Sequence, residues 1–274
     1  MIDVNRRVLP GFGLSLGYTV LYMSLLVLVP IAAGVMRASS LSFADFWAAV
    51  SSSRAVAAYW LTLWTSLASA SINVVIGLLV AWVLVRYEFP LKGLFDSLVD
   101  LPFALPTAVA GLVYSSLFVA NGWYGQFLVP LGIEGAYSRL GIVLVLIFIG
   151  FPFVVRTLQP VLEGLEADVE EAAACLGAGR FDTFRRVIFP SILPAVVTGF
   201  ALAFARSLGE YGSVVFVSGN MPFKTEIAPV LVVARLEEFA YGEAAAIACV
   251  LLVIAFTTLL LINLIERWSK RHHG

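Results

Sequence analysis

The chain alternates between long apolar runs and short polar segments. Six runs contain no charged residue, at residues 8–36, 55–85, 101–133, 140–155, 187–205 and 244–265. A helix that crosses a lipid bilayer needs about 20 predominantly apolar residues. The fourth run is shorter, and it reaches residue 162 if the Arg156 side chain extends to the membrane interface. The pattern predicts an all-α integral membrane protein, a single domain over residues 1–274 with six membrane-spanning helices, at about 12–36, 58–85, 98–120, 140–162, 190–216 and 244–266.

The densest polar segment lies between the fourth and fifth runs. Ten charged residues occur between Arg156 and Pro190, so this segment must lie outside the lipid. Its residue types predict two short helices joined by a turn. Asp168 would cap the first helix, with Glu171 completing a capping box, and Gly177 would end it at positive φ. The second helix would begin at Asp182 or Thr183 and stop before Pro190. On this pattern alone, an ordinary solvated loop with helical content is the alternative.

The positive charges are distributed unevenly between the polar segments. With the N-terminus placed in the cytoplasm, 11 of the 17 lysines and arginines lie in inner segments and five in outer segments. Inner segments of membrane proteins carry the excess of Lys and Arg, so both termini and the dense polar segment are expected in the cytoplasm. The first run follows Arg6 and Arg7 and is too long for a cleavable signal core, so we expect it to be retained as a span.

The composition excludes several function classes. With 61% hydrophobic residues, 13% charged residues and a mean hydropathy of +0.96, the chain is not a soluble globular domain. The net charge of −1 gives no sign of nucleic-acid binding. Cys175 and Cys249 lack metal-ligand spacing, so we expect neither a disulfide nor a metal site. None of the lysines closes a phosphate-binding loop, so the chain itself is not expected to bind ATP.

One short pattern resembles a hydrolase motif without its catalytic partners. Residues 13–17 read Gly-Leu-Ser-Leu-Gly, as in the nucleophile turn of serine hydrolases, but they lie inside the first apolar run. The only histidines are His272 and His273, so no histidine base is available nearby and we expect no catalytic residue. A membrane-embedded enzyme or a passive channel built around Arg206 and Glu210 is the alternative from another class.

Four residues are candidates for a translocation pathway. Arg206 and Glu210 are four positions apart in the fifth predicted span, so they can form an ion pair on one helix face. Charges inside a membrane normally face protein or a water-filled cavity, and the pair would either meet a passing anion or lock two helices together. Pro102 and Pro106 interrupt the third span, which predicts either an irregular helix lining the pathway or a packed kink.

The second polar segment, residues 218–243, is predicted on the outer face. A short amphipathic helix over residues 228–239 would lie on the membrane surface. The segment is either a solvated connector or a surface that receives a partner.

The dense polar segment resembles the EAA signature of ABC-type importer permeases. That signature is Glu-Ala-Ala, three residues, Gly, nine residues and Ile-x-Leu-Pro, and here Val187 and Phe189 replace its Ile and Leu. The resemblance implies that residues 163–190 form a cytoplasmic coupling loop, whose helix docks into a groove on a cytoplasmic ATPase. The residues expected to couple the chain to the ATPase are Glu171, Ala172, Ala173, Gly177, Ala178 and Pro190. Glu171 is expected to meet a basic residue of the ATPase.

Residues 100–112 and 198–213 resemble the sulfate and thiosulfate permease branch of that family. The resemblance implies the type I ABC importer permease fold and alternating access for the anion, with molybdate or another oxyanion as the alternative substrate. It also implies a complex in the bacterial inner membrane. The expected partners are two ABC ATPases that bind ATP and Mg²⁺, a second permease (a copy or a paralogue), an outer substrate-binding protein and membrane lipid, but no nucleic acid.

Overall fold

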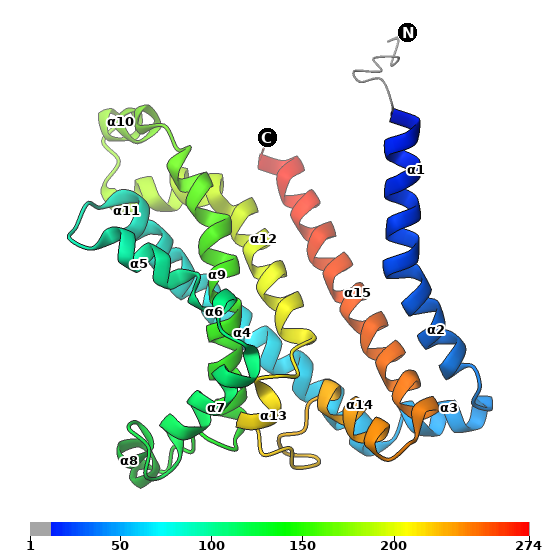
Figure 1. Cartoon of the computed structure of the whole chain (residues 1–274). Coiled ribbons are helices and arrows are strands. Elements are labelled where there is room, and N and C mark those ends of the chain that lie inside the picture. Colours follow the sequence, from blue (N-terminus) through cyan, green and yellow to red (C-terminus); the bar gives the residue numbers. More distant parts are fainter. Residues whose placement is uncertain (1–11, 274) are drawn as a thin grey trace.

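The computed structural model describes residues 12–273, with the backbone alone described for Ala167 and residues 265–273. Every regular element in this range is helical. Arg6, Arg7 and Gly274 lie outside the described residues, so the expectations about the two ends of the chain stay predictions. The described part is built around long helices that run side by side, as Figure 1 shows.

Five helical segments are long and apolar enough to cross a membrane. Two of them contain a π-helical turn, an extra residue inserted into the helical ladder. The segments are Phe12–Ala38 (α1 Phe12–Met23, π-turn Ser24–Leu28, α2 Val29–Ala38), α4 Ser53–Arg86, α9 Arg139–Glu163, Arg180–Leu208 (α11 Arg180–Thr183, π-turn Phe184–Ile188, α12 Phe189–Leu208) and α15 Tyr241–His273, of which Tyr241–Leu264 is the apolar part.

Shorter helices fill the connections between the long ones. Only Thr107–Phe118 among them is an apolar helix of 10–17 residues, and it occupies part of the third predicted span. The shorter elements are α3 Phe43–Val50, α5 Lys92–Val99, α6 Leu101–Ala104, α7 Thr107–Phe118, α8 Gly125–Leu128, a 3₁₀ turn Val129–Leu131, α10 Ala167–Cys175, α13 Val214–Val217 and α14 Ala228–Glu237.

The core lies where α4, α9 and α12 pack against one another. Val154, Leu158 and Ile192 have no exposed surface, and Phe204 is 1% exposed. Small residues allow the close approach that helix packing in lipid requires. A Cβ added at Gly199 would lie 3.2 Å from the Cα of Val154, so α9 and α12 are in near-backbone contact.

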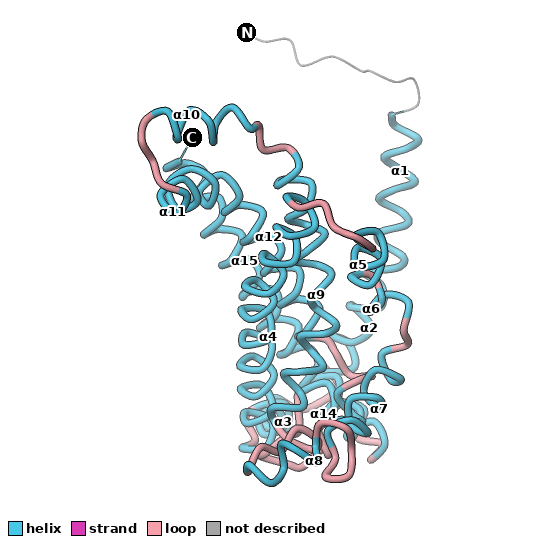
Figure 2. The backbone as a smooth tube through the Cα atoms, turned by 90° about the vertical axis from the view of Figure 1, so that its left-hand side faces the viewer, coloured by secondary structure: helices cyan, strands magenta, loops and turns pink. Residues whose placement is uncertain are grey.

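The first helical segment stands apart from this core. No residue of its apolar window is buried, and α2 packs alongside α15 at the edge of the molecule (Figure 1). Figure 2 shows the two ends of the bundle: α10 and α11 lie at one end, and α3, α8 and α14 lie at the other. Helix α4 reaches from one end to the other.

The third predicted span is interrupted at one of its two prolines, as the sequence indicated, and the fifth helix ends earlier than predicted. Residues 98–120 are not one helix: α6 ends at Ala104, α7 begins at Thr107, and Pro106 lies at the break because its ring and missing N–H disrupt the ladder. The fifth helix ends at Leu208 rather than at residue 216. A sixth membrane span near residues 98–120 therefore stays a prediction.

The helix boundaries predicted around the dense polar segment also need correction. Helix α10 begins at Ala167 with Glu166 at its N-cap position and no side-chain cap, so Asp168 lies inside the first turn. The second helix begins at Arg180, not at Asp182 or Thr183, and continues through Pro190 into α12. The π-turn before Pro190 already breaks the regular hydrogen-bond pattern there, which allows the helix to pass through the proline.

Arg156, predicted to extend to the membrane interface, has partners that the sequence did not predict, and its position relative to the interface stays a prediction. It forms ion pairs with Asp96 and Asp100, 2.7 and 2.6 Å from their carboxylate oxygens. Helix α14, in contrast, confirms a short helix in the outer segment, although Ala228, Val230 and Leu231 are buried against the bundle.

Candidate functional site

The polar segment at residues 163–190, hereafter the coupling segment, exposes large apolar side chains. Leu176 is 89% exposed and Phe181 is 74% exposed, although the segment as a whole is rich in charged residues. Both lie in or beside the turn that joins α10 to α11. Exposed apolar side chains gathered on a polar surface mark a site of protein interaction. The tip of the coupling segment therefore has the character of a docking surface.

The turn after α10 is fixed by Gly177. Its φ is +82°, as the sequence predicted, and a Cβ there would meet nothing within 4 Å. The N–H of Gly177 donates to the carbonyl of Ala174 (2.9 Å), and the N–H of Ala178 donates to the carbonyl of Ala173 (3.0 Å). This pair of bonds is the Schellman motif, which satisfies the last carbonyls of a helix and favours glycine at the left-handed position.

The two adjacent glutamates of α10 point to different surroundings. Glu171 is exposed and forms no ion pair with any residue that the structure describes. Glu170 is half-buried and pairs with Arg86 at the end of α4. Ala173 is buried, Ala172 is exposed, and Ala178 and Pro190 are half-buried. Of the predicted coupling residues, Glu171, Ala172 and Gly177 are therefore accessible to a partner.

A second region forms where two broken helices meet, at residues 104–107 and 209–213, hereafter the junction. A Cβ added at Gly212 would lie 2.3 Å from the Thr107 hydroxyl oxygen, and one at Gly111 would lie 2.2 Å from the carbonyl oxygen of Ser213. The Ser115 hydroxyl also donates to the carbonyl of Phe216 (2.7 Å). The start of α7 is thus in direct contact with the chain that follows α12.

Arg206 and Glu210 form the predicted ion pair, with 2.5 Å between Arg206 Nη1 and Glu210 Oε2. Glu210 lies beyond the end of α12, so the pair joins the helix to its following loop instead of lying on one helix face. The other carboxylate oxygen of Glu210 accepts bonds from the backbone N–H and the hydroxyl of Ser213 (2.9 and 3.0 Å). The Glu210 side chain is 2% exposed, whereas Arg206 is 34% exposed.

The junction contains Pro106 but not Pro102. Pro106 immediately precedes Thr107, which contacts Gly212 in the loop after Glu210. Pro102 lies in α6, where the neighbouring Phe103 packs edge-on against Phe153 of α9. The structure therefore brings together three of the four residues predicted for the pathway, and it places Pro102 with a different neighbour.

Sequence reasoning did not predict a buried polar row on α4 beside the junction. Ser69 lies 3.3 Å from Ser207 of α12 between the two hydroxyl oxygens, and the side-chain amide of Asn73 has no partner among the described residues. The regular spacing of these residues within an apolar helix was the available signal. The members of the row, each at most 1% exposed, are Thr62, Thr65, Ser66, Ser69 and Asn73.

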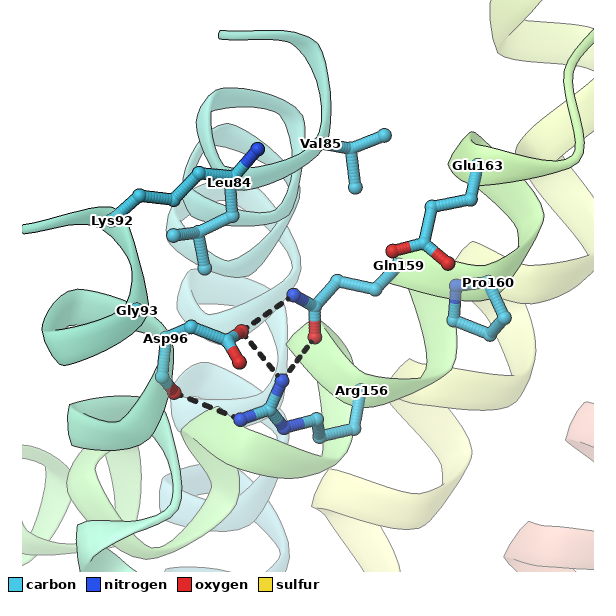
Figure 3. Close-up of a pocket in the computed structure, with 9 residues that line it drawn as sticks. All are labelled: Leu84, Val85, Lys92, Gly93, Asp96, Arg156, Gln159, Pro160 and Glu163. Atoms are coloured by element: carbon cyan, nitrogen blue, oxygen red, sulfur yellow. Dashed lines mark hydrogen bonds and ion pairs between the residues drawn. The ribbon is translucent and has the colours of Figure 1, made fainter. Parts of the chain in front are cut away.

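A further ionic cluster lies between α5 and α9, in a cleft of about 540 Å³ that the end of α4 also lines (Figure 3). Arg156 donates to both oxygens of Asp100 (2.8 and 2.6 Å) and to Asp96 (2.7 Å), which also accepts from Gln159 (2.8 Å). The bonds from Gln159 and Arg156 lower the pKa of the Asp96 carboxyl from its ordinary value. The cluster holds the broken segment before α7 against α9.

The helical fold, the exposed coupling segment and the polar junction define a membrane permease with no catalytic cluster in its described part. The chain belongs to the family of binding-protein-dependent transport system inner membrane components, whose model matches residues 73–271. Members of this family are permease subunits of ABC transporters, which move a substrate without changing its covalent structure. The role of this chain is therefore transport, and it is not an enzyme subunit.

Two relatives match almost the whole chain. The sulfate transport system permease protein CysT of Salmonella typhimurium is 49% identical over 271 residues, covering 98% of both chains. The CysT protein of Synechocystis is 50% identical over 254 residues, covering 93% of this chain and 89% of its own. A chain of a solved bacterial alginate ABC transporter, in complex with an alginate-bound periplasmic protein, gives a TM-score of 0.73 at 18% identity and 92% coverage of each chain. That likeness establishes the type I ABC importer permease fold.

Proposed function

We propose that this chain is the permease subunit of an ATP-driven importer that moves sulfate and thiosulfate into the cell by alternating access. The observation that carries the proposal is its identity of 49% with a sulfate transport permease over 98% of both chains. Both relatives described above bear sulfate in their names, and they lend no support to molybdate or to a membrane-embedded enzyme or channel.

The complex would contain two permeases, two ATPases and one outer binding protein. The second permease is a copy of this chain or a paralogue, and the ATPases bind the ATP and Mg²⁺. In the bacterial inner membrane, both termini and the coupling segment would lie in the cytoplasm, which the asymmetry of Lys and Arg supports. The broken segment at residues 98–120 would supply the sixth span. Reporter fusions after Arg139 and Lys224 should report the outer face, and a cytoplasmic signal at either position would contradict this topology.

The coupling segment would transmit the energy of ATP hydrolysis to the permease. Its exposed Leu176 and Phe181 supply apolar contacts for a groove on the ATPase, and the exposed Glu171 supplies a charge for a basic residue there. Gly177 sets the angle at which α10 meets that groove, because its positive φ determines the direction of the following chain.

The junction would form part of the translocation pathway. Ends of broken helices that meet within the membrane form substrate sites in many transporters. Arg206 is anchored by Glu210 and is one-third exposed, so its planar guanidinium can offer the remaining donors to an oxyanion. Glu210, whose carboxylate is fully occupied by Arg206 and Ser213, would orient Arg206 and keep the site weak enough to release its ligand. A purely structural pair is the alternative for the same geometry.

Uptake by the reconstituted transporter tests the proposed function. The complex is purified through this chain, placed in proteoliposomes with ATP inside and the binding protein outside, and supplied with labelled sulfate. We expect uptake that requires ATP and is competed by thiosulfate, but much less by molybdate. Uptake of molybdate in preference to sulfate would overturn the substrate assignment. Sulfate flux through this chain without any ATPase would contradict its assignment to an ATP-driven importer.

A further inference from the structure

The coupling segment is fastened to the membrane bundle by the last turn of α4. Arg86 donates to a carboxylate oxygen of Glu170 in α10. Its guanidinium carbon also lies 5.3 Å from the centre of the Trp82 ring. The Arg86 side chain is 23% exposed and that of Glu170 is 33% exposed. This pair, the inner tie, is the ion pair that the described residues show between α10 and the bundle.

The same turn of α4 also contacts the helix that follows the coupling segment. The ring of Trp82 packs edge-on against Phe184, with 5.7 Å between ring centres, and Phe184 contacts Phe189 at 6.0 Å. Phe184 is the first residue of the π-turn between α11 and α12. Arg86 therefore connects α4 to α10 through an ion pair, and Trp82 connects α4 to the π-turn after α11 through an aromatic contact.

A second ionic contact fastens the opposite end of α4. Arg54, in its first turn, donates from Nε and Nη2 to both oxygens of Glu226 (2.8 and 2.7 Å). This pair is the outer tie. The Glu226 side chain is 3% exposed, so the loss of its partner would leave a buried charge without compensation. About two turns further along, the Thr62 hydroxyl accepts from the backbone N–H of Ala228 at the start of α14 (2.8 Å).

Helix α4 is a continuous element between the two ties. Its 34 residues span about 50 Å at helical rise, and its middle is held in the core by α9 and α12. Because α4 is continuous between the two ties, a displacement that shifts or tilts its inner end can reach the outer loop while both ties hold. The inner tie holds α10 and the outer tie holds the segment before α14, and Figure 2 shows these two helices at opposite ends of the bundle.

We propose that α4 links the coupling segment to the outer loop at residues 218–227, with Arg86 and Arg54 as positioning residues at its two ends. This inference rests on the proposed function, since the two surfaces communicate only in an assembled transporter. Binding of the outer partner would reach the ATPase through α4, and ATP-driven movement of α10 would reach the outer loop by the same route. Coupling free energies are reciprocal, so weakening either tie affects both directions.

The test measures ATP hydrolysis by the reconstituted complex with and without the binding protein, together with sulfate uptake. We expect Arg86→Gln and Glu226→Gln, changes at opposite ends of α4, each to lower the stimulation of hydrolysis by about tenfold, with a parallel loss of uptake. Hydrolysis without the binding protein should stay near that of the unaltered complex. Lys92→Gln is the matched control, because it removes a pair with the exposed Glu88 near the same end of α4. It should behave as the unaltered complex does.

A charge exchange separates positioning from simple loss of structure. The double variant Arg86→Glu with Glu170→Arg should recover most of the stimulation of ATP hydrolysis that Arg86→Glu alone loses. If Arg86→Gln does not accumulate, this recovery still tests whether the inner tie positions α10. Normal stimulation in both single variants, or no recovery in the exchanged pair, would overturn the role of α4. If the unaltered complex shows no ATP-dependent uptake, the proposed function itself fails, which is a different result.

Discussion

The coupling segment and the junction hold their backbones in place by opposite means. The turn of the coupling segment is closed by bonds between residues at most five positions apart, and its glycine points into open space. At the junction Gly212 and the adjoining Gly111 lie against another segment, and Ser115 bonds a carbonyl 101 residues away. The first region is stabilised locally and presents side chains outward. The second is stabilised by contacts between segments that are distant in sequence, and it buries the carboxylate of Glu210.

This difference follows from the surroundings of each region. Water satisfies backbone groups at the coupling segment, so the segment is free to expose apolar side chains for a partner. Lipid offers no hydrogen bonds, so a broken helix must find its partners within the protein. The carboxylate of Glu210 and the hydroxyl of Ser115 supply those partners. Substitutions at the junction should therefore act on folding, and substitutions at the coupling segment should act on energy transfer.

The largest effect is expected at a junction glycine. Gly111→Ala places a Cβ 2.2 Å from the carbonyl oxygen of Ser213, so the two segments must separate. Overpacking of this kind costs about 1–3 kcal/mol, and we expect lower accumulation and a lower unfolding temperature of the detergent-solubilised chain. Gly209→Ala is the matched control, since its Cβ meets nothing within 4 Å. Equal stability of the two variants would contradict the claim that close contact between distant segments stabilises the junction.

A strong effect of a different kind is expected in the coupling segment. Gly177→Val forces a β-branched residue to a φ of +82°, at a local cost of about 1–2 kcal/mol, so the turn should adopt another direction. Accumulation in the membrane should be close to normal, whereas sulfate uptake should be lost. Gly179→Val has open space at a φ of −72° and should transport normally. Normal uptake by Gly177→Val at normal expression would exclude the turn from the mechanism.

A smaller effect is expected from Arg206→Lys, which keeps the charge and removes the planar fork. If the fork binds the oxyanion, uptake should fall by about tenfold, while assembly and stimulated ATP hydrolysis persist. Failure of the complex to assemble would establish the purely structural pair. Survival of assembly, hydrolysis and uptake together would show that the fork has no part in recognition.

The smallest effect is expected from acidification around Asp96. Because its pKa in the folded chain lies below the ordinary value of 3.8, its contacts stabilise the fold above that pH and are lost as pH falls through the lowered pKa. The side chain is 41% exposed, so solvent screening keeps the effect small. Asp96→Asn should lower the unfolding temperature slightly at neutral pH and match the unaltered chain in acid. A constant difference at all pH values would contradict the ionic contribution.

The features that the sequence predicted well are local or periodic ones. The helical class, most of the apolar segments, the positive φ of Gly177 and the pairing of Arg206 with Glu210 all depend on neighbours within a few positions. Capping rules failed at Asp168, because the chain enters α10 two residues earlier and the cap position carries Glu166.

The features that the sequence did not reveal depend on contacts between distant segments. The inner and outer ties join residues 84 and 172 positions apart, and the Arg156 cluster joins residues up to 63 apart. A charge within or beside an apolar run showed that a partner was needed, but no periodicity could identify that partner. The break after Leu208 had a weak signal in Gly209 and Gly212, whose meaning depends on the neighbouring α7.

Cross-linking from the natural cysteine of the coupling segment tests the central claim most directly. Cys175 is exposed at the end of α10, whereas Cys249 is half-buried in α15. A linker that joins a thiol to a lysine is applied to the active, purified complex, with Cys249→Ser present throughout. We expect a product between this chain and the ATPase that disappears in Cys175→Ser. An active complex in which Cys175 is fully labelled but never joined to the ATPase would contradict docking at this segment.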